Sequence, residues 1–272
     1  DSLARTAWKA LALRAALRLG WYRDIAAWVA VSRFVKERFV EAGVPAGKVH
    51  VLAYPFFPDG EGAPPPLPRG HFLFLGRLSV AKGVCTLLQA WSIVRASAGE
   101  GGTPTLVIAG DGELRAEVEA AAAASGGTIQ YAGVVNGGRK QELIRGCAAM
   151  VVPSLWWDPY PTVVYEAYDQ GRAVLAAQSG GLPEAVRDGV SGLLHTPGDA
   201  GELARHALSL WNEAGAAVRM GAAGREWLLA RSGPDWWWRE FEKLLGRALP
   251  QRVQHSAERP EDLLACHAQG AE

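Results

Sequence analysis

The feature that most constrains the fold is an alternation, from His71 onward, between short unbroken apolar runs and segments with helical periodicity. The runs include FLFL (72–75), TLVIA (105–109) and MVV (150–152). A strand that is apolar at every position is buried on both faces, which is typical of a parallel sheet covered by helices on both sides. The chain is therefore predicted to be an α/β protein built on such a sheet.

The expected elements follow from this alternation, because apolar runs of four to eight residues indicate buried strands and longer periodic segments indicate helices. Further helices are expected between 215 and 249, and no internal repeat is present. The predicted strands are 71–75, 104–109, 128–132, 149–153, 173–178 and 192–196, and the predicted helices are 83–97, 113–125, 139–147, 162–170 and 199–213.

The chain before this sheet is predicted to form two helices and two short strands. Residues 1–23 are rich in Ala, Leu and Arg, which favours a helix. The apolar segments 25–31 and 49–54 are interpreted as strands. Ser32 is expected to cap a helix between them, which Gly43 ends.

Two segments lack the pattern of regular structure. Residues 55–70 (PFFPDGEGAPPPLPRG) are dense in Pro and Gly and are predicted to be an interdomain linker. The tail 251–272 is polar and mixed in charge, and it is predicted to be disordered. The domain between them is expected to cover 71–232, followed by a helix at 233–250.

Composition limits the partners and the location of the protein. The formal net charge of the 272 residues is zero, so nothing global indicates a nucleic-acid partner. The three cysteines are far apart and odd in number, which favours a reducing, cytoplasmic setting. No apolar run is long enough to span a bilayer. The basic excess near the N-terminus is interpreted as solvation, and peripheral membrane contact stays open.

A site is expected at the strand-to-helix turns, because ligands of an open parallel sheet bind beyond the carboxyl ends of its strands. The first turn runs from Gly76 to Gly83 and carries Arg77 and Lys82. A lysine at the start of a helix is unfavourable unless an anion binds there. An arginine fork beside it suits a diphosphate. The alternative interpretation is a pair of solvated loop cations.

The second turn follows the strand that ends at Pro153, and it contains Asp158. The helix after it carries Glu166, whose carboxylate is placed to accept hydrogen bonds from two ribose hydroxyls. The amides of Thr162 and Val163, at the start of that helix, suit a phosphate. The alternative interpretation is a surface glutamate and a turn-forming aspartate.

The third turn contains Gly180 and Gly181, directly before a short helix that Pro183 and Glu184 begin. Two glycines allow the backbone to approach a ligand closely. The alternative interpretation is an ordinary Gly-Gly turn.

Together, in this order and spacing, the three turns resemble glycosyltransferase family 4, the retaining enzymes of GT-B architecture. The matching strings include FLGRLSVAKGV, LVIAGDGELRAEVE, DPYPTVVYEAYDQGRAVLAAQSGGLPEAV and RDGVSGLLHTPGDAGELA. The resemblance implies that 71–232 is the C-terminal, nucleotide-sugar-binding half of such a fold, with a Rossmann-like parallel sheet. It also implies that 1–54 is a remnant of the N-terminal, acceptor-binding domain, and that the helix 233–250 crosses back onto it.

By the same resemblance, Arg77 and Lys82 hold the donor diphosphate, and Glu166, the second acid of an E-x7-E motif, binds the ribose. Asp158 takes the place of the first acid, near the donor sugar, although the family's usual Glu is one methylene longer. A UDP- or GDP-sugar donor is implied, with no cofactor and no metal. The further residues expected to line the donor site are Gly76, Gly110, Val134, Val135, Thr162, Val163, Gly180 and Gly181.

The implied function is transfer of a hexosyl group, with retention, from a nucleotide sugar to a glycan, lipid or small-molecule acceptor. Most of the acceptor domain is expected to be missing from these residues, and none of the six histidines lies in the context of the family's acceptor-domain histidine. A non-catalytic nucleotide-sugar-binding fragment and a sugar-nucleotide epimerase of the same architecture remain as alternatives. A nicotinamide dehydrogenase is disfavoured because the first turn lacks G-x-G-x-x-G.

Overall fold

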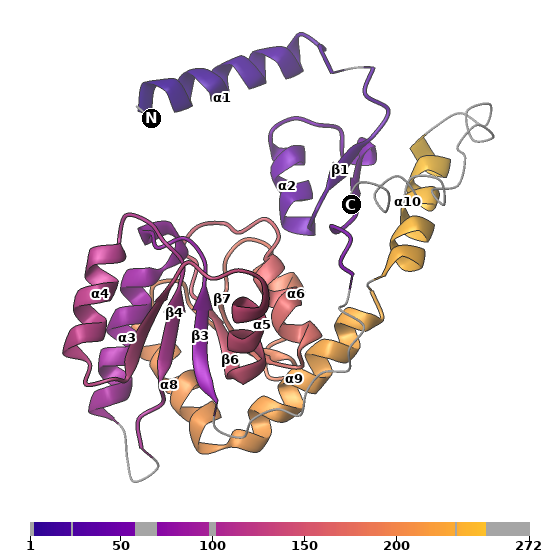
Figure 1. Ribbon diagram of the computed structural model, residues 1–272. Coiled ribbons are helices and arrows are strands. Elements are labelled where there is room, and N and C mark those ends of the chain that lie inside the picture. Colours follow the sequence, from indigo (N-terminus) through magenta and orange to yellow (C-terminus); the bar gives the residue numbers. More distant parts are fainter. Residues whose placement is uncertain (1–2, 23, 58–69, 98–101, 232, 249–272) are drawn as a thin grey trace, which may run out of the picture.

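All six strands predicted from His71 onward form one parallel sheet, with helices on both faces (Figure 1). The computed structural model describes residues 3–22, 24–57, 70–97, 102–231 and 233–248. The strand order is β5-β4-β3-β6-β7-β8. The strands are β3 (His71–Leu75), β4 (Leu106–Ala109), β5 (Ile129–Gly133), β6 (Cys147–Val152), β7 (Ala173–Ala177) and β8 (Gly192–His195).

The topology of this sheet defines where a ligand can bind. Strand β3 is first in the sequence but lies in the middle of the sheet, where it pairs with β4 on one side and β6 on the other. Phe72, for example, is in register with Leu106 and with Ala149. The chain therefore reverses its direction of winding between β3 and β6. The crevice at the carboxyl ends of these two strands is the switch point at which such sheets bind ligands.

Apolar packing on both faces explains why the strands are apolar at every position. Phe72 and Phe74 contribute to the core under one set of helices, and Leu73 contributes to the core under the other. Trp91 is completely buried in the first core, where its Nε1 donates to the carbonyl of Pro104 at 3.1 Å. The first set is α3 (Val84–Ala96), α4 (Arg115–Ala124) and α8 (Ala200–Asn212), and the second is α5 (Gly137–Gly146), α6 (Thr162–Asp169) and α7 (Leu182–Ala185).

Two predicted strands begin two residues away from their predicted starts, as do the helices predicted at 113–125 and 139–147, which begin at Arg115 and Gly137. Strand β4 begins at Leu106 rather than at residue 104, where a proline has no N–H to donate to the ladder. Strand β6 begins at Cys147 rather than at residue 149, because α5 ends at Gly146 and the chain enters the sheet without a loop. Cys147 is already fully buried there.

The N-terminal unit is a small α/β motif. Strands β1 (Trp28–Ala30) and β2 (Val49–Val51) pair in parallel, and α2 (Arg33–Glu41) connects them. The predicted cap of α2 is confirmed, since the Ser32 hydroxyl accepts a hydrogen bond from the Val35 amide at 3.3 Å. Before them, α1 (Leu3–Arg18) is exposed along almost its whole length.

The last described helices connect the two units. Helix α9 (Ala214–Leu229) packs on the main sheet, and α10 (Pro234–Ala248) extends toward the N-terminal unit (Figure 1). The indole Nε1 of Trp237 donates to the carbonyl of Ala53 at 2.9 Å. Residues 58–69 of the predicted linker and the whole predicted tail, 251–272, lie outside the described residues.

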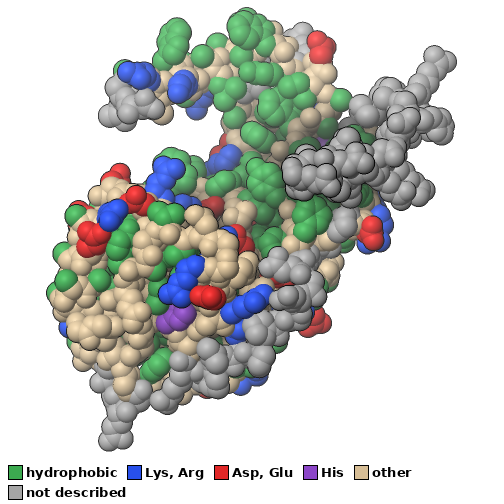
Figure 2. Space-filling model, in the orientation of Figure 1, with side chains coloured by type: hydrophobic (Ala, Val, Ile, Leu, Met, Phe, Trp, Pro, Cys, Tyr) green, Lys and Arg blue, Asp and Glu red, His purple; other side chains and the backbone are tan. Residues whose placement is uncertain are grey.

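Apolar side chains gather on the surface of the N-terminal unit, in the upper part of Figure 2, where Figure 1 shows α1, β1 and α2. Trp8 and Trp21 are each more than 70% exposed. No helix in the described part of the chain is long and apolar enough to cross a membrane. Within the same residues, no cluster of three or more His, Cys, Asp or Glu side chains could hold a metal ion.

Candidate functional site

Two adjoining cavities lie at the carboxyl ends of β3 and β6. The larger has a volume of 340 Å³ and the smaller one of 160 Å³. They share Leu75, Gly76 and Val163 in their walls, so together they form one groove across the switch point. Most of the residues predicted from the sequence line it. Arg77, Gly110, Val134 and Val135 line the larger cavity, and Lys82, Asp158 and Thr162 line the smaller.

The loop from Gly76 to Gly83 is held by close backbone packing. A Cβ on Gly110 would overlap the carbonyl of Gly76, and Gly110 has a φ of +141°, which few L side chains adopt. The Leu78 amide donates to the carbonyl of Asp111 at 2.9 Å. These contacts fix the floor of the groove.

Lys82 is the last residue of a short turn (Val80–Lys82) that directly precedes α3, close to the helix start where it was predicted. The Ser79 hydroxyl caps the short turn before the helix by accepting from the Lys82 amide at 3.3 Å. Gly83 follows with a φ of +75°, and a Cβ there would overlap the carbonyl of Pro153. Only a glycine therefore lets this loop pack against the end of β6.

Lys82 and Asp158, predicted as separate site residues, form an ion pair. Lys82 Nζ lies 2.7 Å from Asp158 Oδ2. Asp158 is only 8% exposed, and the lysine side chain is about a third exposed. The ammonium has three donors, so it can keep this carboxylate and still bind an anion in the smaller cavity.

Glu166, the predicted ribose ligand, is paired with a residue that the sequence analysis missed. Lys140 Nζ lies 2.7 Å from Glu166 Oε2. Lys140 projects from the first turns of α5 and lines the larger cavity. The signal that pointed to Lys82, a lysine near the start of a helix that follows a parallel strand, is also present at Lys140 and could have identified it.

Arg77 is exposed at the larger cavity, and its guanidinium makes no hydrogen bond or ion pair with any described residue. Its five donors are therefore available to a ligand. The amide of Thr162, by contrast, donates to the carbonyl of Tyr160 at 3.1 Å. One of the two amides predicted to face a phosphate is thus engaged within the loop.

The Gly180–Gly181 turn packs on the loop that carries Asp158. The Gly181 amide donates to the Asp158 carbonyl at 2.7 Å, and a Cβ on Gly180 would overlap the same backbone. The Ser179 hydroxyl donates to the Trp156 carbonyl at 2.8 Å. The close approach that these glycines allow is therefore to Asp158 and its neighbours.

Two stacked tyrosines adjoin the groove: Tyr160 is half-buried on the wall of the smaller cavity, and Tyr165 is buried. Burial raises the pKa of Tyr160 and of Tyr165 above the ordinary value for a phenol. Their rings stack with centroids 4.7 Å apart. Both phenols therefore stay protonated near neutral pH, and their stacked rings support the loop through packing.

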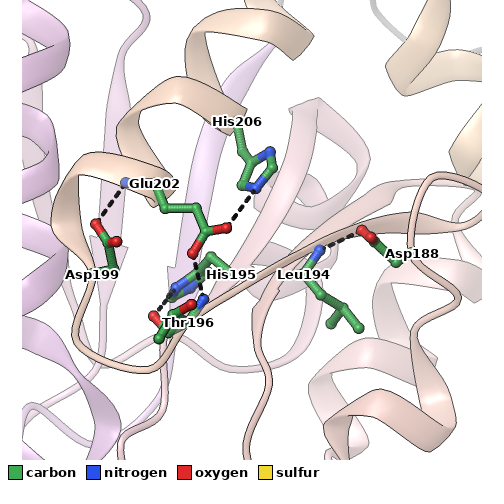
Figure 3. Close-up of polar contacts among 7 residues, drawn as sticks. All are labelled: Asp188, Leu194, His195, Thr196, Asp199, Glu202 and His206. Carbon is green, nitrogen blue, oxygen red and sulfur yellow. Dashed lines mark hydrogen bonds and ion pairs between the residues drawn. The ribbon is translucent and has the colours of Figure 1, made fainter.

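A separate cluster of titratable side chains lies at the turn between β8 and α8 (Figure 3). Asp199 caps α8 by accepting from the Glu202 amide at 2.8 Å, and Glu202 accepts from the Thr196 amide at 2.7 Å. His195 is fully buried, with Nδ1 2.9 Å from the Thr196 carbonyl. Glu202 lies 3.9 Å from His206. The geometry is that of a helix cap, so this cluster is structural.

Comparison with known proteins decides the family. The model of the family "Glycosyl transferases group 1" matches residues 69–213, which is more than half of the chain and contains every predicted site residue. The chain belongs to the group 1 glycosyltransferases. The family inferred from the three turns is therefore confirmed.

Curated relatives of this glycosyltransferase chain include the 2-deoxystreptamine glucosyltransferase of Streptomyces kanamyceticus, which is 31% identical over 162 residues. That match covers 59% of this chain and 41% of the relative. The alpha-maltose-1-phosphate synthase of Mycobacterium tuberculosis is 30% identical over 170 residues, covering 58% of this chain and 43% of the relative. The chain thus spans less than half the length of these relatives.

Solved structures show the same fold at low sequence identity. Anabaena Alr3699/HepE, determined in complex with UDP, has a TM-score of 0.74 and 21% identity, over 90% of this chain and 70% of that one. TarM has a TM-score of 0.70 and 14% identity, over 80% of this chain and 43% of that one. The predicted Rossmann-like sheet of a GT-B glycosyltransferase is confirmed.

Proposed function

We propose that this glycosyltransferase chain supplies the nucleotide-sugar donor site of a retaining enzyme that transfers a hexosyl group. The observation that carries the proposal is that one loop places Arg77 at the larger cavity and Lys82, paired with Asp158, at the smaller one. The larger cavity is also lined by Lys140, which is paired with Glu166. Family membership supports it. So do the HepE structures in complex with UDP, with UDP and glucose, and with UDP-glucose, which favour UDP over GDP as the donor nucleotide.

In the proposed reaction, the two cations stabilise the leaving diphosphate. Negative charge grows on the diphosphate as the glycosidic bond breaks. Lys82 binds one phosphate oxygen while it keeps Asp158, and Arg77 presents its planar fork to the other phosphate. Because these side chains supply the positive charge, we propose that donor cleavage needs no divalent ion and no cofactor.

The carboxylates are assigned to the sugar parts of the donor. Lys140 engages Oε2 of Glu166, so we assign Oε1 to the ribose hydroxyls. Asp158, on the wall of the smaller cavity, lies next to the position of the transferred sugar. Gly76, Gly110, Val134 and Val135 are proposed to contact the base and ribose. Thr162, Val163 and the Gly180–Gly181 turn are proposed to lie near the phosphates and the sugar.

The acceptor is proposed to bind to a second domain across the crevice, of which 1–54 would be the remnant in this chain. Closure of two such domains assembles the site and excludes water. We therefore propose that transfer requires the second domain to close over the donor. The sugar-nucleotide epimerase has no observation in its favour beyond the fold.

A cytoplasmic location, with peripheral membrane contact, remains a proposal.

The test is calorimetric titration of the chain with UDP and with GDP in the presence of a chelator. Micromolar to millimolar binding of one nucleotide is expected. Binding should be at least tenfold weaker in Arg77→Ala and in Glu166→Ala, because each removes a charge-assisted contact of about 1.5–3 kcal/mol. Arg205→Ala, an exposed cation on α8, is the matched control and should bind as the wild type does. A folded chain that binds neither nucleotide would contradict the proposal.

A further inference from the structure

The N-terminus of α2 is capped by a carboxylate from the other unit of the protein. The Arg33 amide donates to Glu184 Oε2 at 2.9 Å, and the Phe34 amide donates to Glu184 Oε1 at 2.8 Å. The first amides of a helix have no partner within it, and the positive end of the helix dipole favours an anion. Glu184 lies on α7, 150 residues further along the chain. This cap therefore joins the N-terminal unit to the main sheet.

A second contact from α2 reaches the loop that carries Asp158. The rings of Phe34 and Trp157 meet edge to face, with centroids 5.5 Å apart. The Arg38 guanidinium lies over both rings, 5.2 Å from Phe34 and 5.5 Å from Trp157. Helix α2 thus touches the residue directly before Asp158.

The backbone next to Glu184 packs directly against the backbone of Asp158. Helix α7 begins directly after the Gly180–Gly181 turn, and Leu182 on it is fully buried against the sheet. The turn is bonded to the Asp158 carbonyl at 2.7 Å, and a side chain on Gly181 would meet the carbonyl of Pro159 at 2.7 Å. A shift of α7 would therefore move the backbone of Asp158.

We propose that Glu184 is a positioning residue for the donor site. By capping α2, its carboxylate holds the N-terminal unit against α7 and the Trp157–Asp158 loop. In that position Asp158 holds the ammonium of Lys82 at the smaller cavity. This role rests on the proposed donor function, because Glu184 is proposed to set the position of α2 relative to the end of the groove that binds the phosphates.

The decisive variant is Glu184→Gln. The carboxamide keeps the shape of the side chain but has one oxygen acceptor, and its NH₂ group cannot accept from the second amide. Glu184 is exposed, so the variant is expected to fold. Glu213→Gln, an exposed glutamate paired with Arg219 between α8 and α9, is the matched control. Phe34→Leu removes the second contact and is expected to change the same properties in the same direction.

The first measurement is hydrogen exchange of the backbone amides, which does not require a nucleotide. In Glu184→Gln, exchange at Arg33 and Phe34 is expected to become about tenfold faster, because hydrogen bonds to a charged acceptor are lost. Exchange in residues 156–158 should also become faster. Unchanged exchange at Arg33 and Phe34 would overturn the cap, and unchanged exchange in 156–158 would overturn its transmission to the loop.

The second measurement compares the affinities for a nucleoside diphosphate and its monophosphate, using the base that the wild type binds. In Glu184→Gln the ratio of UDP to UMP affinity is expected to fall about fivefold. A variant that merely lost stability would bind both nucleotides equally less well, and that result would overturn the positioning role. If the wild type bound neither nucleotide, the proposed function would fail, while hydrogen exchange would still test the cap.

Discussion

At the scale of single residues, the groove is defined by two lysine–carboxylate pairs. Lys82 pairs with Asp158, and Lys140 pairs with Glu166, each at 2.7 Å. The first pair lines the smaller cavity, whereas Lys140 lines the larger one. We therefore expect the first pair to affect binding of the phosphates of a nucleotide, and the second pair to affect binding of its ribose.

Lys140→Met is predicted to weaken UMP and UDP binding by the same factor, about threefold to tenfold. The substitution keeps an unbranched side chain, one atom shorter and without charge, and it leaves Glu166 free to rotate away from the ribose, which both nucleotides contain. Calorimetric titration with UMP and with UDP measures the two affinities. The control is Arg139→Met, at the adjacent exposed position. A loss confined to UDP would instead place Lys140 on the β-phosphate.

The buried His195 and the half-buried His71 are predicted to make stability depend on pH. Burial lowers the pKa of His195 and of His71 below the ordinary value of 6.5. The unfolded chain therefore binds more protons than the folded one at mildly acidic pH, so stability is lost as the pH falls through 6.5 toward the folded-state values. Glu202 has a lowered pKa because Thr196 donates to it, and its contribution is lost only below about 4.5.

Urea denaturation at a series of pH values between 8 and 5 checks this prediction. The free energy of unfolding should decline below pH 6.5, and the decline should be smaller in His195→Gln. A wild-type curve that is flat from pH 7 to 5 would contradict it.

At the scale of elements, the turns between strands and helices carry the candidate site residues, and glycines in these turns allow them to pack closely against one another. Gly180 has a φ of +59° and lies against the Asp158 backbone. Gly126, with a φ of +64°, has open space around its Cβ position. Comparing the two separates backbone strain from steric overlap.

Gly180→Ala is predicted to destabilise the chain by roughly 2–5 kcal/mol, and Gly126→Ala by about 1–2 kcal/mol. Both carry the cost of a left-handed conformation for an L residue, about 1–2 kcal/mol. Only the first adds an overlap that forces the Asp158 loop to move, which costs a further 1–3 kcal/mol or so. Urea denaturation measures both, and equal losses would show that the turn is not packed on the loop.

At the scale of the whole molecule, the N-terminal unit leaves much apolar surface exposed. Val29 and Val51, on the two paired strands, are both more than 40% exposed, and Trp8 and Trp21 are exposed around α1. Figure 2 shows these parts of the surface as largely apolar. Monomeric proteins rarely expose large contiguous apolar patches.

The chain is therefore predicted to associate with itself. Sedimentation velocity should show an average mass that rises with concentration in the range of tens of micromolar. Trp8→Ser combined with Trp21→Ser should reduce this association without changing nucleotide affinity, because neither residue lines the groove. A monomer at 100 micromolar would contradict this prediction.

The sequence alone determined the architecture, because the unbroken apolar strands can be satisfied only by a sheet that is buried on both faces. It also placed the candidate site residues on the strand-to-helix turns. Arg77, Lys82 and Asp158 all lie in the groove, since parallel strands bring their carboxyl ends to one edge. These features depend on local pattern and topology.

Only the tertiary structure decided which of these residues meet. The pairing of Lys82 with Asp158, of Lys140 with Glu166, and of Glu184 with the start of α2 joins positions far apart in the chain. The contact of α2 with Trp157 is of the same kind. No periodicity records such pairings, because side-chain contacts depend on the distances between packed elements and not on the spacing of residues within one of them.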